Sequence, residues 1–443
     1  MTQPPSQQSA VLPEVSGILP VDVDAAACEI PLTHGPADPT TWPTAVESLA
    51  RPLGTSPAPT TLAELTTLRV GGPVREYLEV STEAELIDAV RAADADGIPL
   101  LVIGGGSNIL ASDSGFAGLV VRDARTDVRL LSDDRCGGVE VQATAGTTWD
   151  DLVREAVVSQ WGGFAPLSGI PGTVGAAPVQ NIGAYGAEVA ELIASVRAWD
   201  RAFGKTVHLP LSELALSYRD SALKRSLTDA AVGGGRTWGP TGRWVVLQVV
   251  FTVRQATLSA PVAYKQLAQA LGVKLGERAP MREVREAVLA LRSSKGMVLD
   301  AADYDTWSAG SFFTNPILAA SEAEALPAEA PRFPVADYSR ATSAGGVPVL
   351  EGLVKTSAAW LIDHAGFGKG WAVGGGTDGD AGRGAAGGAV APAASLSTKH
   401  VLALTNRGGA TAADLIALRD AVVSGVRERY GVTLVPEPVH VGW

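Results

Sequence analysis

Residues 161–185 lie within the longest stretch of the chain without a charged side chain, and they constrain the fold more than any other segment. Glycines and prolines recur along this stretch, and both destabilise a helix interior, so a membrane-spanning helix is excluded. The overlapping segment SGIPGTVGAAPVQNIGAYG at 168–186 contributes Gln180 and Asn181 as polar contacts. A long, uncharged, glycine-spaced loop is typical of a segment whose backbone lies against a ligand.

A second glycine segment, GGGSN at 104–108, directly follows an apolar run at 98–103 that predicts a strand. Glycines let backbone N–H groups approach an anion closely, and Ser107 and Asn108 add side-chain hydrogen bonds. A tight turn explains these residues equally well when they are considered alone. The spacing is not GxGxxG and the chain has no GxxxxGK[ST], so neither a Rossmann fingerprint nor a P-loop is predicted.

Charge and cysteine content exclude several classes of function. Thirty-five basic against 47 acidic residues give a net charge of −12, so we expect neither a nucleic-acid partner nor a membrane partner. Cys28 and Cys136 are the only cysteines and the five histidines form no HExxH, which argues against a disulfide scaffold and a metal site. Residues 1–20 contain four prolines and no Lys or Arg, unlike a secretory signal, and we expect a cytoplasmic protein.

Composition divides the chain into an arm, a mixed core and a low-complexity loop. Residues 1–60 carry 11 of the 28 prolines, and their six acids against one base predict a flexible acidic arm. Residues 372–395 contain eight Gly and eight Ala, which predicts a loop and not packed structure. Strands and helices alternate in the core without a regular βαβ period, so an α+β fold is expected.

Local patterns predict the main elements of this core. Thr82 and Glu85 form a capping box that opens a helix through about residue 93. Thr411 caps a helix near the end of the chain, and Gly431 ends it. We also expect strands at Val74–Val80, 98–103, 120–122, 139–143, 196–200 and Trp244–Val253, and helices at 148–159 and 281–294.

Taken together and in order, several motifs resemble the MurB family of UDP-N-acetylenolpyruvoylglucosamine reductases. Their joint order is much more specific than any single piece. The matching stretches are TTLRVGG at 66–72, IGGGSNIL at 103–110, SGIPGTVGAAPVQNIGAYG at 168–186, SYRDS at 217–221, RSSK at 292–295, AGSFFTNP at 309–316, AAWLIDH at 358–364 and VPE at 435–437.

The resemblance implies a flavoprotein with an α+β fold of the vanillyl-alcohol-oxidase/PCMH type. Beyond the arm at 1–60, FAD-binding subdomains would occupy 61–125 and 126–256, and a substrate-binding domain would occupy 257–443. FAD would be held non-covalently, since the glycine loop offers no His or Cys as an anchor. NADPH would be the co-substrate, a monomer is expected, and the subtype would be the one whose tyrosine loop closes over the sugar nucleotide.

The implied reaction reduces enolpyruvyl-UDP-GlcNAc to UDP-N-acetylmuramate in peptidoglycan precursor synthesis. Hydride would pass from flavin N5 to C3, and a proton would reach C2. Arg219 suits the negative charge that builds on C2 and its carboxylate, because a guanidinium fork can bind a carboxylate in two places. The resemblance makes Ser311 the proton donor and Glu437 the catalytic carboxylate. Without it, they would be interpreted as a turn serine and an ordinary loop residue.

The resemblance also implies which residues hold the cofactor and the substrate. The expected FAD-binding residues are Gly104, Gly105, Gly106, Ser107, Asn108, Ile170, Gly172, Gly175, Gly183, Ala184 and Tyr185. The expected substrate-binding residues are Tyr218, Tyr264, Arg292, Lys295, Asn315 and His364. Lys295 could equally be a solvated charge at a helix end, and His364 a packing histidine, while Phe312 and Phe313 are expected in the core.

Two other functions stay open from the sequence. One is an FAD-dependent oxidase or dehydrogenase of the same fold that acts on another alcohol or sugar. The other is a catalytically silent sugar-nucleotide-binding regulator. The combination of Arg219, Ser311 and Glu437 argues against both.

Overall fold

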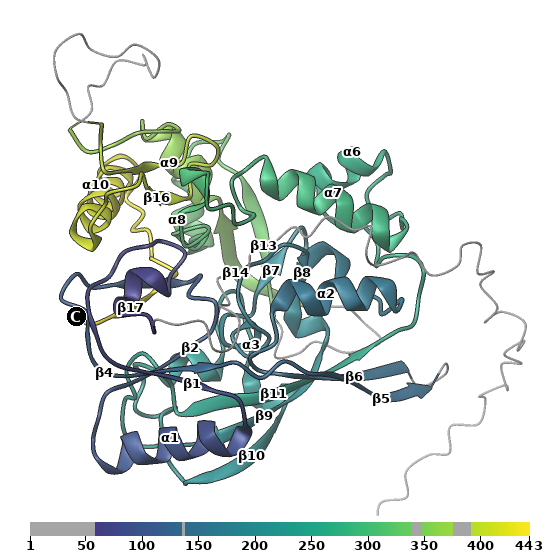
Figure 1. The fold of residues 1–443 in the computed structure, drawn as a ribbon. Coiled ribbons are helices and arrows are strands. Elements are labelled where there is room, and N and C mark those ends of the chain that lie inside the picture. Colours follow the sequence, from purple (N-terminus) through teal and green to yellow (C-terminus); the bar gives the residue numbers. More distant parts are fainter. Residues whose placement is uncertain (1–57, 135–137, 338–347, 375–390) are drawn as a thin grey trace, which may run out of the picture. The chain divides into compact units, whose positions relative to one another are not determined.

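The computed structural model describes residues 58–134, 138–337, 348–374 and 391–443, all within a compact unit that spans residues 38–443 (Figure 1). Cys28, Cys136, nearly all of the predicted acidic arm and most of the predicted Gly/Ala loop lie outside these residues. The predictions made for those segments therefore stay predictions.

A three-stranded parallel sheet with the order β1-β4-β2 begins the core. Helix α1 packs on this sheet through Leu86 and Val90, which are fully buried. The predicted capping box is present, because Thr82 Oγ1 accepts from Glu85 N at 3.2 Å and the Glu85 carboxylate accepts from Thr82 N at 3.1 Å. The bounds are η3 (Leu62–Glu64), β1 (Val74–Val80), α1 (Glu83–Ala95), β2 (Leu100–Ile103), β3 (Ile109–Ala111) and β4 (Phe116–Asp123).

A five-stranded antiparallel sheet with the order β10-β9-β11-β6-β5 follows. One face packs against α2, where the rings of Trp149, Phe164 and Phe251 lie 5.3 to 6.2 Å apart. From the other face, Trp199 and Leu247 enter the core formed by α1 and the parallel sheet. The bounds are β5 (Val128–Asp134), β6 (Gly138–Thr144), α2 (Trp149–Val158), β9 (Ile193–Asp200), β10 (Lys205–Pro210) and β11 (Trp244–Val253).

The long uncharged stretch folds into short turns and helices, as its glycines and prolines require. No described helix is long and apolar enough to cross a membrane. The bounds between α2 and β11 are η4 (Ala165–Leu167), α3 (Ala177–Gln180), β7 (Gly183–Ala184), β8 (Ala187–Glu188), η5 (Val189–Glu191), α4 (Leu211–Leu214) and α5 (Ala222–Arg225).

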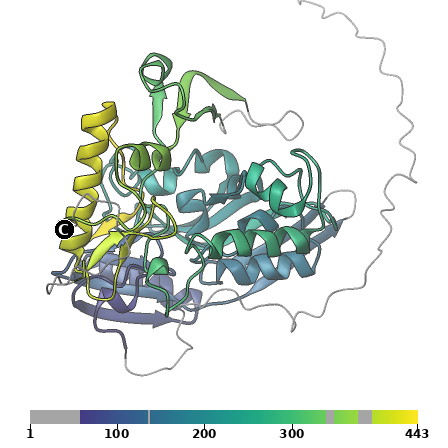
Figure 2. The ribbon, with the colours of Figure 1, turned by 90° about the horizontal axis from the view of Figure 1, so that it is seen from above.

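The helices α6 (Lys265–Leu271) and α7 (Met281–Ser293) follow β11 and belong to the teal and green part of the ribbon (Figure 2). A buried ion pair joins α7 to α2. Both Nη atoms of Arg285 lie 2.7 Å from the carboxylate of Asp150. The same carboxylate accepts from Gly169 N at 2.6 Å. One pair of charges therefore joins α2, α7 and the start of the glycine segment at 168–186.

The last part of the chain contains two small sheets and the longest helix. Helix α10 buries a stripe at Leu415, Leu418, Val422 and Val426, and it ends at Gly431, whose φ is +69°, as the sequence predicts. The bounds are η6 (Tyr304–Thr306), β12 (Ile317–Ala319), α8 (Ala320–Glu324), β13 (Arg332–Ala336), β14 (Val349–Thr356), α9 (Ala358–His364), β15 (Ala394–Leu396), β16 (Leu404–Asn406), α10 (Ala412–Tyr430) and β17 (Val439–Val441).

The prediction that 372–395 is an unpacked loop was wrong at both of its ends. Ala372 is buried, and Ala394 and Ser395 are buried within β15, which pairs with β16. Alanine and serine side chains are small enough to fit closely against the core of α10, so low complexity did not prevent packing there.

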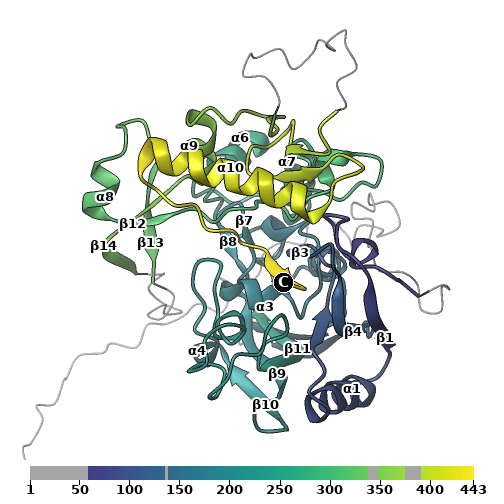
Figure 3. The same cartoon turned by 90° about the vertical axis from the view of Figure 1, so that its left-hand side faces the viewer.

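The C-terminal strand β17 returns across the fold to pair in parallel with β3 (Figure 3). Val439 N donates to Asn108 O at 2.9 Å, and Ser112 N donates to Val441 O at 2.8 Å. This pairing places Glu437 immediately beside the GGGSN segment, which precedes it by more than 300 residues.

Candidate functional site

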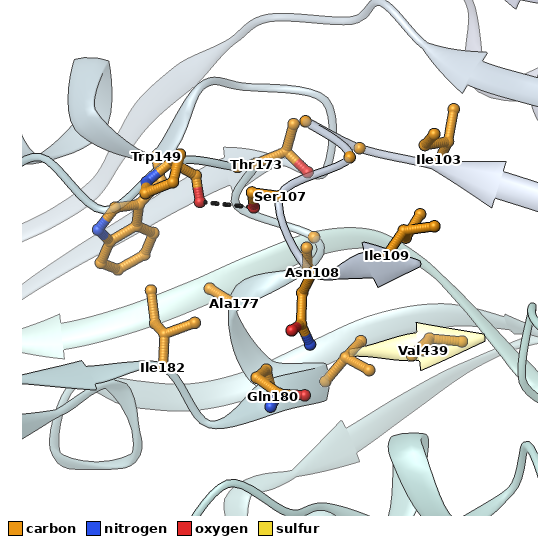
Figure 4. A pocket seen from close by; sticks show the side chains of 18 of the residues that line it. Ile103, Ser107, Asn108, Ile109, Trp149, Thr173, Ala177, Gln180, Ile182 and Val439 are labelled. Carbon is orange, nitrogen blue, oxygen red and sulfur yellow. Dashed lines mark hydrogen bonds between the residues drawn. The ribbon is translucent and has the colours of Figure 1, made fainter. Parts of the chain in front are cut away.

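Both glycine segments line one cavity of about 360 Å³, which lies within the range of small-molecule sites. Figure 4 shows Ser107 and Asn108 from the first segment and Ala177, Gln180 and Ile182 from the second around it. Of the expected site residues, those that line the cavity are Gly104, Gly105, Gly106, Ser107, Asn108, Ile170, Gly172, Gly175, Gly183, Arg219, Arg292, Ser311 and Glu437.

The two glycine segments pack directly against each other. A Cβ on Gly104 would lie 2.6 Å from Thr173 Oγ1, and a Cβ on Gly105 would lie 2.8 Å from Gly172 Cα. Ser107 Oγ donates to the carbonyl oxygen of Pro171 at 3.0 Å (Figure 4). These glycines are therefore required by contact between the two loops, in addition to any contact with a ligand.

The backbone of GGGSN is available to an anion. No described residue accepts a hydrogen bond from the amide N–H groups of residues 104–108. Gly106 has a φ of +60°, a left-handed conformation that turns successive N–H groups toward one side. A buried atom also lacks a partner at the cavity, since Arg292 Nε is enclosed without a hydrogen bond. These donors, with the apolar lining beside them, fit a flat ring that carries a diphosphate.

Arg219 occupies a strained position beside the second glycine segment. Its φ is +56°, which residues with a Cβ rarely adopt. Its Nη1 donates to Asn181 O at 3.1 Å and its Nη2 to Gly183 O at 2.7 Å. One N–H of each terminal nitrogen is thus directed to the loop, and no described residue accepts from the other N–H of either nitrogen.

Glu437 is held from two sides. Gln180 Nε2 donates to Glu437 Oε1 at 2.7 Å, and Arg219 Nε lies 3.5 Å from the same oxygen. The backbone N–H of Glu437 donates to Phe312 O at 2.9 Å, next to Ser311. The three residues that the resemblance implies as catalytic therefore meet around one cavity.

Ser311 lies in a turn that buried contacts fix on both sides. Thr67 Oγ1 donates to Ser308 O at 2.6 Å, and Phe312 N donates to Leu402 O at 2.8 Å. Phe312 is fully buried and Phe313 nearly so, as predicted for core residues. The turn therefore presents Ser311 to the cavity from a rigid base.

Arg292, Lys295 and Lys369 form a cationic group whose charges act on His400, and of these residues only Arg292 lines the cavity. Burial lowers the pKa of Arg292 to about 10. Burial and the neighbouring charge of Arg292 also lower the pKa of Lys295, whose Nζ donates to Gln266 at 2.8 Å. Burial lowers the pKa of His400 to about 4, and the positive charges of Lys295, Lys369 and Arg292 add to that effect. Such a group of positive charges favours the binding of an anion.

Five expected contacts do not line the cavity, namely Tyr185, Tyr264, Lys295, Tyr218 and Asn315. Tyr185 and Tyr264 pack edge to face at 5.5 Å, and Lys295 Nζ lies 5.7 Å from the ring of Tyr185. Asn315 N donates to Tyr218 Oη at 3.3 Å. The guanidinium carbon of Arg219 lies 5.4 Å from the centre of the Tyr218 ring. Burial raises the pKa of Tyr185 and of Tyr218, and the charges of Arg292 and Arg219, respectively, act in the opposite direction. Ala184 does not line the cavity either.

His364 is not brought to the cavity. It lies at the exposed end of α9, where its ring stacks on Trp360 at 4.1 Å and its Nδ1 contacts Trp360 O at 3.0 Å. A side chain held this way on its own helix fits the packing interpretation. Asn181 is also structural, because it is fully buried and bonds Glu188, Ser217 and Ala190.

Several lining or neighbouring residues were not singled out from the sequence. Trp149, Thr173, Met297 and Val439 line the cavity, and Lys369 and His400 join the cationic group. They are scattered over six segments, and no local pattern separates them from ordinary core or surface residues. No group of three or more potential metal ligands occurs among the described residues.

Comparison with known proteins gives matches over most of the chain. Residues 74–210 match the family of FAD binding domains, and residues 302–441 match the C-terminal domain of UDP-N-acetylenolpyruvoylglucosamine reductase. The reductases of Nocardia farcinica and Cutibacterium acnes are 49% and 46% identical over 381 residues, which cover 86% of this chain and 88% and 89% of theirs. The chain belongs to the UDP-N-acetylenolpyruvoylglucosamine reductase family.

The fold of this reductase family member is also that of a solved relative. The crystal structure of UDP-N-acetylenolpyruvylglucosamine reductase from Thermus caldophilus aligns with a TM-score of 0.51 and 23% identity, over 86% of this chain and 97% of that one. The predicted family and the predicted FAD-binding fold with a separate C-terminal domain are confirmed. The tyrosine-loop subtype stays a prediction.

Proposed function

We propose that this enzyme uses NADPH and non-covalent FAD to reduce enolpyruvyl-UDP-GlcNAc to UDP-N-acetylmuramate in peptidoglycan precursor synthesis. Family membership supports the substrate and the reaction. The observation that carries the proposal is the convergence of Arg219, Glu437 and Ser311 on the cavity lined by both glycine segments.

The two glycine segments would hold FAD. The free amides of residues 104–108 would bind its diphosphate, while the small residues of 170–183 would lie against the ring. When bound, FAD supplies the hydride that reaches C3 of the substrate. Because the glycine loop contains neither His nor Cys, nothing in it offers a covalent anchor.

Arg219, Glu437 and Ser311 would act on the enolpyruvyl group. The free N–H groups of Arg219 would bind the carboxylate on which negative charge builds. Glu437, held by Gln180, would keep Arg219 oriented. Its carboxylate would also accept a hydrogen bond from the group that donates the proton. Ser311 would give its proton to C2, which requires a site that stabilises the oxygen left behind.

The cationic group would bind the anionic end of the sugar nucleotide. Burial lowers the pKa of the half-buried His400, the positive charges of Lys295, Lys369 and Arg292 lower it further, and a diphosphate would compensate these charges. Tyr264, which packs on Tyr185 next to this region, and Asn315, which lies beside Tyr218 and Arg219, would add further contacts. We further propose the domain limits 61–125, 126–256 and 257–443, a monomeric state and a cytoplasmic location.

The test is spectroscopic and uses the purified full-length chain. Its visible flavin bands should bleach when NADPH is added without oxygen, and they should return when the enolpyruvyl sugar nucleotide is added. Bands that bleach but do not return would indicate a different acceptor, such as that of another oxidase or dehydrogenase. A colourless protein that binds the sugar nucleotide but cannot be reconstituted with FAD would indicate a silent binding protein.

A further inference from the structure

Lys224 is a half-buried cation close to the proposed catalytic residues. It lies on the short helix α5 and does not line the cavity itself. Its Nζ donates to the backbone oxygen of Arg219 at 3.2 Å. No described carboxylate forms an ion pair with it, because Asp220 pairs with Arg225 and Glu437 lies against Gln180 and Arg219.

This hydrogen bond is made to the strained residue of the site. Arg219 has a left-handed backbone, which is unfavourable for a side chain with a Cβ and persists only where the surroundings hold it. Ser217 and Asp220 bond each other's backbone on either side of it, at 3.0 and 3.1 Å. Lys224 adds a third restraint, directly on the carbonyl of Arg219.

The position of Lys224 is itself fixed by the second glycine segment. Ser221 caps α5 by accepting from Lys224 N at 2.9 Å, and its Oγ donates to Val179 O at 2.7 Å. Val179 precedes Gln180, which holds Glu437. One segment therefore sets the positions of both Lys224 and Glu437.

The charge of Lys224 is poorly compensated in this arrangement. Burial lowers its pKa, as does the charge of Arg219, while Glu437 and Asp220 act in the opposite direction. A half-buried ammonium with one neutral acceptor beside another cation is unfavourable until negative charge is added nearby. The reduction of the enolpyruvyl group builds negative charge at that place.

We propose that Lys224 is a positioning residue for the reduction step: its ammonium group holds the left-handed Arg219 in place and provides a second fixed positive charge beside Glu437. The inference rests on the roles proposed above for Arg219 and Glu437. It explains why a lysine without a carboxylate partner lies half-buried at this point.

The test compares Lys224→Met, Lys224→Arg and, as a control, Lys274→Met, which removes an exposed lysine in the turn that follows α6. The two half-reactions are followed separately by anaerobic stopped-flow absorbance, with flavin content and thermal melting as checks. Lys224→Met should reoxidise with the enolpyruvyl sugar nucleotide about 10- to 100-fold more slowly, because Arg219 is displaced, while reduction by NADPH stays within about twofold. Lys224→Arg should recover most of the lost rate, and Lys274→Met should match the unsubstituted enzyme.

The pH profile gives a second readout that a merely structural role would not move. The ammonium faces Arg219, Asp220 and Glu437, and its lowered pKa predicts that reoxidation slows at alkaline pH as the charge is lost. In Lys224→Arg this limb should move to higher pH, because a guanidinium stays charged.

Three outcomes decide against the proposal. Reoxidation by Lys224→Met at the unsubstituted rate would overturn it, and so would equal slowing of both half-reactions. If Lys224→Met does not fold, an unchanged alkaline limb in Lys224→Arg would overturn it. An unsubstituted enzyme that is not reoxidised by the sugar nucleotide would instead overturn the proposed function.

Discussion

The two ends of the cavity are built in opposite ways. The end formed by residues 104–108 and 169–183 is made of backbone, and its glycines fit because two loops touch without side chains between them. The end marked by Arg292 lies near Lys295 and His400, which do not line the cavity; these side chains come from two segments of the chain, and burial lowers their pKa values. A backbone site tolerates almost no added atom, whereas a side-chain site depends on which charges it collects.

Ser311→Ala tests the proposed proton transfer at the cavity, and it should give the largest effect. Removal of a proton donor should slow reoxidation by the substrate about 100- to 10,000-fold, while reduction by NADPH stays nearly intact. Stopped-flow absorbance of each half-reaction measures this, and Ser321→Ala, on the exposed side of α8, is the control. Equal loss in both half-reactions would remove Ser311 as the donor.

Asp150→Ala removes the buried carboxylate that joins α7, the helix that carries Arg292, to the start of the second glycine segment. It leaves Arg285 buried without its partner and Gly169 N without its acceptor, and should lower the free energy of unfolding by about 3–5 kcal/mol. Asp151→Ala is a matched control, because the carboxylate of this adjacent residue forms only a surface ion pair with Arg154. Its removal should lower the free energy of unfolding by less than about 1 kcal/mol. Urea unfolding of both variants compares them, and equal stabilities would show that the buried carboxylate contributes nothing.

Gly106→Ala tests the backbone end alone. A Cβ there would lie 1.9 Å from Leu65 O. The substitution should therefore lower the free energy of unfolding by about 1–3 kcal/mol more than the substitution of a glycine that has a similar φ and no atom close to its Cβ. Gly272→Ala provides that control, with a φ of +68° and nothing within 4 Å of its Cβ. Flavin content after purification and thermal melting are the measurements. FAD retention equal to the control would contradict a backbone cradle.

His400→Gln tests the side-chain end, with the smallest effect. The pKa of His400 is lowered to about 4, below the unfolded value near 6.5, so the unfolded state binds the proton first and stability falls as the pH drops from about 6.5 to 4. In the unsubstituted protein the free energy of unfolding should fall by about 1–3 kcal/mol over this pH range, and the variant should not show this fall. Urea unfolding between pH 4 and 7.5 measures this. An unchanged slope in the variant would assign the acid sensitivity elsewhere.

The sequence predicted those features that local geometry controls. Helix α1 begins at its capping box because Thr82 and Glu85 satisfy the free N–H groups of the first turn. Helix α10 ends at Gly431 because glycine adopts the left-handed conformation at little cost. The glycine segments were predicted as ligand-contacting loops for the same reason, and the ordered motifs predicted the family.

Only the tertiary structure decided how the site is assembled. The pairing of β17 with β3 brings Glu437 to Asn108 and Gln180 across more than 250 residues, and no local pattern encodes such a pairing. His364 was expected at the site, but it stacks on Trp360, while His400 lies among the cations instead. Backbone conformation depends on neighbouring residues, so a sequence reveals it. The charge around a side chain depends on which distant segments pack together, and that is fixed only when the chain has folded.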